Sequence, residues 1–81
     1  MITIGAPGPE KRTIWVTARQ HPGETMAEWW MEGFLNRLLD PISADAKHLL
    51  EHAVFHVVPN MTPDGSARGH LRTNAVGVNL N

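Results

Sequence analysis

Two short hydrophobic runs, separated by two segments with helical periodicity, constrain the fold of this chain more than any other feature. Residues 13–18 and 53–58 are rich in β-branched and aromatic side chains. The first run is nearly continuous in hydrophobicity, which favours a strand buried on both faces. The order strand–helix–helix–strand is typical of parallel strands in an α/β sheet, because a crossover of that length returns the chain in the same direction.

The segment between the runs carries signals for two helices. Hydrophobic residues recur at helical spacing over residues 24–39, at Ala27, Trp30, Met31, Phe34, Leu35 and Leu38. Asp40–Pro41 is expected to end this helix, and Ser43 suits the N-cap of a second one over residues 44–52. Short extended pieces are expected at residues 1–5 and 76–78.

The chain is too short to complete such a domain. With 81 residues it buries about 60% of its unfolded surface, and a parallel sheet needs helices on both faces. Two helices and two or three strands cannot supply that cover. We therefore expect residues 1–81 to be the N-proximal fragment of a single larger α/β domain, incomplete at its C-terminus.

Charge and cysteine content exclude several classes of partner. Seven Lys+Arg balance eight Asp+Glu, so no general attraction to nucleic acid is expected. The longest apolar runs are too short to span a bilayer, so no membrane partner is expected either. The absence of cysteine favours the cytoplasm and excludes a thiolate metal site.

Polar loops follow both predicted strands, at the edge where open α/β sheets bind ligands. His21 and Glu24 lie in the first loop, three residues apart, and an imidazole with a carboxylate suits zinc. From spacing alone, an interpretation without a metal is equally open. In it, Glu24 complements the dipole of the following helix and His21 is a polar residue that ends the strand. His48 and Glu51 repeat the spacing within the second predicted helix, where a solvated surface pair is expected.

The C-terminal segment is rich in arginine and asparagine. Arg68 and Arg72 are followed by Asn74, Asn79 and Asn81. Guanidinium and amide groups bind carboxylates and polarise carbonyls. The alternative is a solvated basic loop, and the segment alone favours that alternative.

Taken together, residues 18–24, 57–65, 69–74 and 77–81 resemble the zinc metallocarboxypeptidases of the funnelin type, in the cytosolic-carboxypeptidase-like branch. The resemblance extends over residues 13–81. It implies a three-layer α/β/α domain with a mainly parallel or mixed sheet. It also implies a zinc enzyme that hydrolyses the C-terminal peptide bond of a peptide or protein by metal-activated water.

The resemblance implies roles for four residues. His21 and Glu24 match the first two zinc ligands, Arg72 matches the catalytic, carbonyl-polarising arginine, and Asn81 matches the asparagine that binds the substrate's C-terminal carboxylate. The family's third zinc ligand, its general-base glutamate and the arginine after Asn81 have no counterpart here. We therefore expect the 81 residues alone to bind zinc weakly and to be inactive.

Two alternatives remain open. A related zinc amidohydrolase of N-acyl amino acids also uses a His-x-x-Glu pair. A non-catalytic remnant would expose a sheet edge and apolar faces, which favours association into a homo-oligomer.

Overall fold

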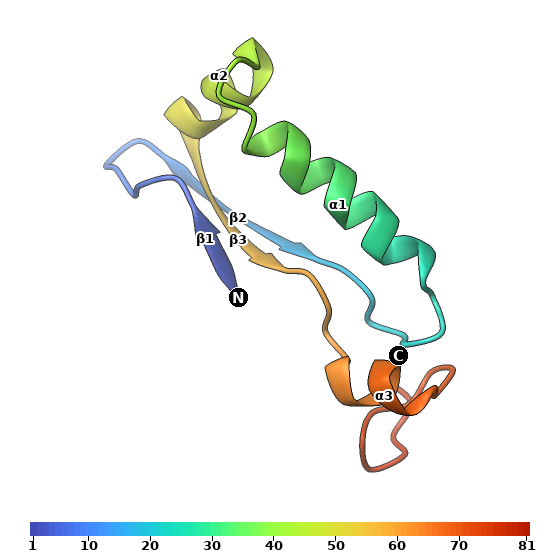
Figure 1. The fold of residues 1–81 in the computed structure, drawn as a ribbon. Helices are drawn as coiled ribbons and strands as arrows, with labels where there is room; N and C mark the ends of the chain where they lie inside the picture. The colour runs from blue at the N-terminus through green and yellow to red at the C-terminus, as the bar shows by residue number, and fades with distance from the viewer.

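A computed structural model describes all 81 residues as a mixed α/β unit. Helices α1 and α2 lie together over one face of a small sheet, and α3 with the C-terminal segment lies beyond the sheet's end (Figure 1). The elements in chain order are β1 (Ile2–Ile4), β2 (Arg12–Thr17), α1 (Met26–Leu38), α2 (Ala44–His52), β3 (Ala53–Val58) and α3 (Pro63–Arg68). The predicted α/β class is therefore confirmed.

The sheet has the order β1-β3-β2. Strand β2 runs parallel to β3, with Arg12 opposite Ala53 and Thr17 opposite Val58. Strand β1 pairs antiparallel on the other side of β3, with Ile4 opposite Phe55. The sheet is thus mixed, and the parallel pair predicted from the long crossover is present. Because β2 and β3 end in register, the loops that follow them start at the same edge.

Local signals set the bounds of α1 and α2. The Ser43 hydroxyl accepts a hydrogen bond from the Ala46 backbone N–H at 3.3 Å and begins α2, as predicted. Helix α1 ends at Leu38, before Asp40–Pro41. It begins at Met26, two residues later than expected, because Glu24 belongs to a turn in which its N–H bonds the carbonyl of His21 at 3.1 Å. None of the helices is long and apolar enough to cross a membrane.

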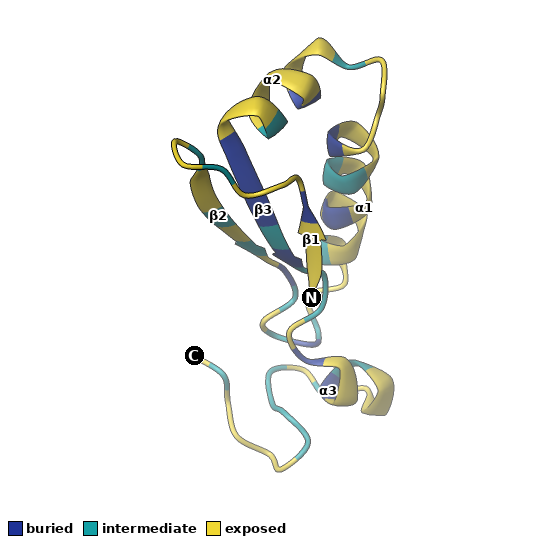
Figure 2. Ribbon diagram, turned by 90° about the vertical axis from the view of Figure 1, so that its left-hand side faces the viewer, coloured by how far each residue is buried: buried dark blue, intermediate teal, exposed yellow.

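The main hydrophobic cluster lies on one face of the sheet. Phe55 and Val57 of β3 pack with Met31 and Leu38 of α1, and all four side chains are buried. On the other face Trp15 is 61% exposed, beside the ring of His56 at a centroid distance of 4.8 Å. Strand β2 is exposed at alternate residues, as the yellow and teal segments of Figure 2 show.

The prediction of a first strand buried on both faces is therefore wrong for this chain. Both helices belong to one crossover between β2 and β3, and a crossover of fixed hand places its helices on one side of the sheet. No helix of this chain covers the second face, where Val54 is buried but Trp15 is exposed. The same observation supports the sequence argument that two helices cannot enclose such a sheet.

The C-terminal segment differs from expectation in two places. The polar loop expected after the second predicted strand contains the short helix α3, with Pro63 in its first turn and Gly69 ending it at φ 75°. Residues 76–78 form no strand. They lie in a loop closed by the pair Thr73 and Asn79, and the Asn74 side-chain oxygen accepts hydrogen bonds from the N–H groups of Val76 and Val78.

Candidate metal and substrate site

The loops after β2 and β3 are joined by hydrogen bonds at the carboxyl edge of the sheet. The Ala18 N–H donates to the carbonyl of Val58, and the Met61 N–H donates to the carbonyl of Ala18, both at 3.0 Å. The buried Thr62 hydroxyl donates to the carbonyl of Arg19 at 2.8 Å. The two polar loops predicted to converge do so, and each supports the other's backbone.

Arg19 has a left-handed backbone, with φ 53°, which is uncommon for a residue with a side chain. Its guanidinium Nε donates to the carbonyl of Pro22 at 2.9 Å, and its Nη1 pairs with the carboxylate of Glu28 on α1. Strained backbone of this kind persists where surrounding contacts fix it. These two contacts hold the loop that carries His21 against the start of α1.

The C-terminal segment docks on this loop through two glycines. The Gly23 N–H donates to the carbonyl of Leu71 at 2.7 Å, and a Cβ on Gly23 would lie 2.8 Å from that same oxygen. A Cβ on Gly65 would collide with the carbonyl oxygen of Thr73. Only glycine permits backbones to approach this closely. Leu71 and Thr73 are thus held on either side of Arg72, which places its side chain beside His21.

All four predicted site residues lie in one connected cluster. His21 Nδ1 lies 3.2 Å from Glu24 Oε2, and Arg72 Nη2 lies 3.1 Å from His21 Nε2. The same Nη2 donates to Asn81 Oδ1 at 3.0 Å. A guanidinium can only donate, so Nε2 is the acceptor and the ring proton lies on Nδ1, facing Glu24. The His21 side chain is 13% exposed and that of Glu24 is 50% exposed, so the pair opens to solvent on the carboxylate side.

The distance between His21 and Glu24 fits a shared metal ion as well as a hydrogen bond. Ligand atoms bound to tetrahedral zinc at 2.0–2.1 Å lie about 3.3 Å from one another, close to the 3.2 Å seen between Nδ1 and Oε2. No third His, Asp or Glu joins the two within ligand distance. His70 contacts the carbonyl of Asn74 instead, at 3.2 Å. Two of the three protein ligands that a catalytic zinc needs are therefore available here.

Several polar residues that support the cluster were not singled out by the sequence. Asn60 donates from Nδ2 to Glu28 and to Ser66, and its Oδ1 accepts from the Thr62 N–H at 2.9 Å. The Gln20 amide donates to the carbonyl of Leu80, next to Asn81. Their position just after the strands was the available signal, because side chains there face the ligand-binding edge. A hollow of ≈ 460 Å³ between α1 and α2 shares no residue with this cluster.

Comparison with known proteins assigns the chain to one family. Residues 1–81 match the family model described as zinc carboxypeptidase. An uncharacterised protein of Zymomonas mobilis, ZMO1242, is 65% identical over 74 residues, which are 91% of this chain and 20% of that protein. Cytosolic carboxypeptidase-like protein 5 of Rattus norvegicus is 42% identical over 82 residues, covering 96% of this chain and 10% of that protein.

Two solved structures share the fold. A putative carboxypeptidase A from Shewanella denitrificans matches with a TM-score of 0.92 and 64% identity, over 98% of this chain and 21% of that one. A metallo-carboxypeptidase from Pseudomonas aeruginosa, in complex with (2-guanidinoethylmercapto)succinic acid, matches with a TM-score of 0.88 and 48% identity, over 98% of this chain and 21% of that one. The chain thus spans about a fifth or less of the length of these relatives.

Proposed function

Because the chain belongs to the zinc carboxypeptidase family, we propose that residues 1–81 are the N-proximal part of a catalytic α/β/α domain that hydrolyses the C-terminal peptide bond of peptides or proteins. Two observations support the assignment as part of a domain: the chain spans 21% of similar solved structures, and one face of its sheet is bare. The observation that carries the function is the contact series from Glu24 through His21 and Arg72 to Asn81.

In this proposal His21 and Glu24 hold the zinc. A zinc ion in such a site lowers the pKa of its bound water to about 7 and polarises a carbonyl. If Nδ1 were the ligand, the ring proton of His21 would have to lie on Nε2. Arg72, which can only donate, would then lack its acceptor on His21 and be free to contact substrate.

Arg72 and Asn81 form the substrate-binding part of the proposal. The Arg72 guanidinium has five N–H donors in a planar fork, which suit a carbonyl oxygen that becomes negative during attack. Asn81 accepts from Arg72 through Oδ1, so its amide nitrogen is left with two donors. Those donors suit the carboxylate at the end of a peptide substrate. Arg72 is the proposed catalytic residue and Asn81 a substrate-binding one.

The proposed location is the cytoplasm, and the proposed partner is a peptide or protein C-terminus rather than nucleic acid or a membrane. Relatives named cytosolic carboxypeptidase-like support the location, as does the absence of cysteine. The near balance of seven basic and eight acidic residues supports a substrate other than nucleic acid.

The deciding experiment compares two substrates in the full-length protein that contains these residues. A peptide with a free C-terminus should lose its last amino acid, whereas an N-acyl amino acid should stay intact. His21→Ala should abolish the release and remove tightly bound zinc, measured by metal analysis after dialysis. His48→Ala serves as the matched control and should keep the release of the last amino acid. Cleavage of the N-acyl amino acid alone would favour the amidohydrolase alternative, and equal loss of the release in both variants would refute the choice of His21.

A further inference from the structure

Helix α2 carries three potential metal ligands on its solvent side, separate from the cluster around His21. His48, Glu51 and His52 are all exposed, and their ligand atoms lie within 4.8 Å of one another. The sequence pattern favoured a solvated pair of His48 and Glu51. The helix adds His52, because residues four apart lie one turn above each other on the same face.

The two imidazoles are arranged so that each can present a nitrogen to one ion. Their ring centroids lie 4.5 Å apart, with the planes inclined by 44°. His52 Nδ1 lies 2.8 Å from the carbonyl oxygen of His48. A carbonyl only accepts, so Nδ1 carries the proton and Nε2 keeps the free lone pair. Histidines that ligate metals are commonly held in this way, with the second ring nitrogen donating to a backbone carbonyl.

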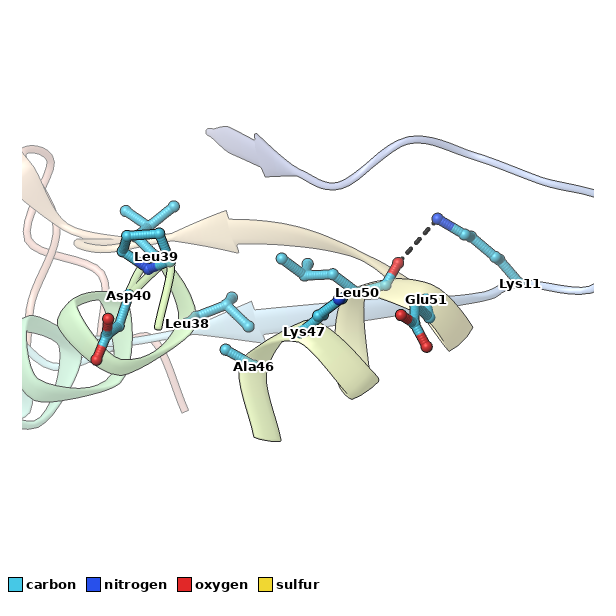
Figure 3. A pocket seen from close by; sticks show the side chains of 9 residues that line it. Lys11, Leu38, Leu39, Asp40, Ala46, Lys47, Leu50 and Glu51 are labelled. Carbon is cyan, nitrogen blue, oxygen red and sulfur yellow. Dashed lines mark hydrogen bonds between the residues drawn. The ribbon is translucent and has the colours of Figure 1, made fainter. Parts of the chain in front are cut away.

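The end of α2 that bears the ligands is held to the sheet. Lys11 Nζ donates to the carbonyl of Leu50 at 2.8 Å, one residue before Glu51 (Figure 3). Helix C-termini have unsatisfied carbonyls, and a lysine that binds one stabilises the last turn. Ser43 stabilises the first turn. The three ligands are therefore presented by a helix that is capped at both ends.

We propose that His48, Glu51 and His52 form a second metal site, which takes a divalent cation of borderline softness such as Zn²⁺, Ni²⁺ or Cu²⁺. Two imidazoles and one carboxylate favour these ions over Mg²⁺ or Ca²⁺, which prefer oxygen ligands alone. Water completes the coordination, because the site faces solvent. Residues 1–81 offer three ligands here and two at His21 and Glu24, so the α2 site fills first in this chain.

The test is a calorimetric titration of the full-length protein, purified with its tightly bound zinc, with Ni²⁺ and, separately, Zn²⁺. One ion should bind per chain to the α2 site ahead of any weaker event. His48→Ala and His52→Ala should each weaken that binding by roughly 10–100-fold, and Glu51→Gln by roughly tenfold, since each removes one donor. His21→Ala should leave it unchanged. All three α2 side chains are exposed, so these substitutions remove no core contact, and circular dichroism should verify that each variant keeps its helices.

A matched control tests whether metal binding depends on the spacing of the histidines or only on their number. The double variant Asp45→His with His48→Ala keeps the number of histidines but sets them seven residues apart, about 10 Å along the helix, too far to share one ion. It should bind as weakly as His48→Ala alone. Binding equal to that of the unaltered chain would overturn the proposal, as would loss of the first event in His21→Ala. Failure here would leave the role proposed for His21 untouched, because the two sites share no residue.

Discussion

The helix-covered sheet and the C-terminal segment from Thr62 to Asn81 are held in place by different forces. The first region is stabilised by the burial of hydrophobic side chains such as Phe55, Val57 and Met31, an interaction that does not depend on direction. The second contains one short helix and is fixed by individual hydrogen bonds and by two glycine contacts. Hydrophobic packing therefore stabilises the helix-covered sheet, which we call the frame. Single polar and steric contacts set the position of Arg72 and Asn81.

Phe55→Ala should have the largest effect and should fall on the frame. Phe55 is buried on the central strand and contacts Phe34 at a centroid distance of 6.1 Å. Removal of a buried phenylalanine costs about 3–5 kcal/mol of stability through lost burial and the cavity left behind. Chemical denaturation of the full-length protein, monitored by circular dichroism, measures this. Ile42→Ala, in the loop between α1 and α2, is the control and should cost far less, because Ile42 is 90% exposed and lies outside the sheet; a comparable loss would contradict the assignment of Phe55 to the core.

Arg72→Ala should spare the frame and damage the chemistry. In the full-length protein kcat should fall by about 10²–10³-fold, the effect expected when a donor to a developing oxyanion is removed. Zinc content and thermal stability should stay at the level of the unaltered protein. Arg68→Ala is the matched control, since Arg68 binds the carbonyl of Ala75 and has no contact with His21. An unchanged kcat in Arg72→Ala would remove Arg72 from the mechanism.

Gly23→Ala should disturb the connection between the two regions. The added methyl group would lie 2.5 Å from the Leu71 side chain and 2.8 Å from its carbonyl oxygen, so the C-terminal segment must move. Overpacking of this kind costs about 1–3 kcal/mol. Amide hydrogen exchange should show faster exchange after Thr62 with little change in β3.

Gly33→Ala supplies the control for that experiment. Gly33 lies in α1, and its added methyl group would meet nothing within 4 Å. Alanine favours a helix by up to about 1 kcal/mol over glycine, so this variant should be neutral or slightly more stable. If Gly23→Ala left exchange in the C-terminal segment unchanged, the glycine contact would not be what docks it.

Ser43→Ala should give the smallest effect, confined to the start of α2 and to Arg37 of α1, whose Nε also donates to the Ser43 hydroxyl at 3.2 Å. The Ser43 hydroxyl binds the Ala46 N–H, and loss of an N-cap typically costs about 1 kcal/mol. A melting curve followed at the helical signal measures it. A loss of activity at intact stability would contradict the separation of the two regions.

The sequence predicted the frame well because its signals are local. Ser43 and the hydrophobic run at residues 53–58 gave the bounds of α2 and β3, and the crossover length gave the parallel pair. The exposure of β2 was missed, because it depends on the face of the sheet over which one crossover places both helices. The polar motifs identified the four residues of the candidate cluster, and their roles stay a prediction.

The backbone contacts that bring those four residues together could not be predicted from the sequence. It depends on contacts between distant residues, above all Gly23 with Leu71 and Gly65 with Thr73. Helix α3 was not predicted within the polar loop, because Pro63 suits both the first turn of a helix and a β-turn. His52 was not grouped with His48 and Glu51, since pairwise spacing alone does not show which side chains converge.

The separation of His21 and Arg72 by 51 residues has a consequence for biosynthesis. Domains fold as units as the ribosome delivers them from the N-terminal end, and distant pairings form slowly. His21 and Glu24 are a single turn apart and leave the ribosome together, ahead of Arg72. The contact between the imidazole and the guanidinium can therefore form only after the chain has been synthesised through β3 and α3.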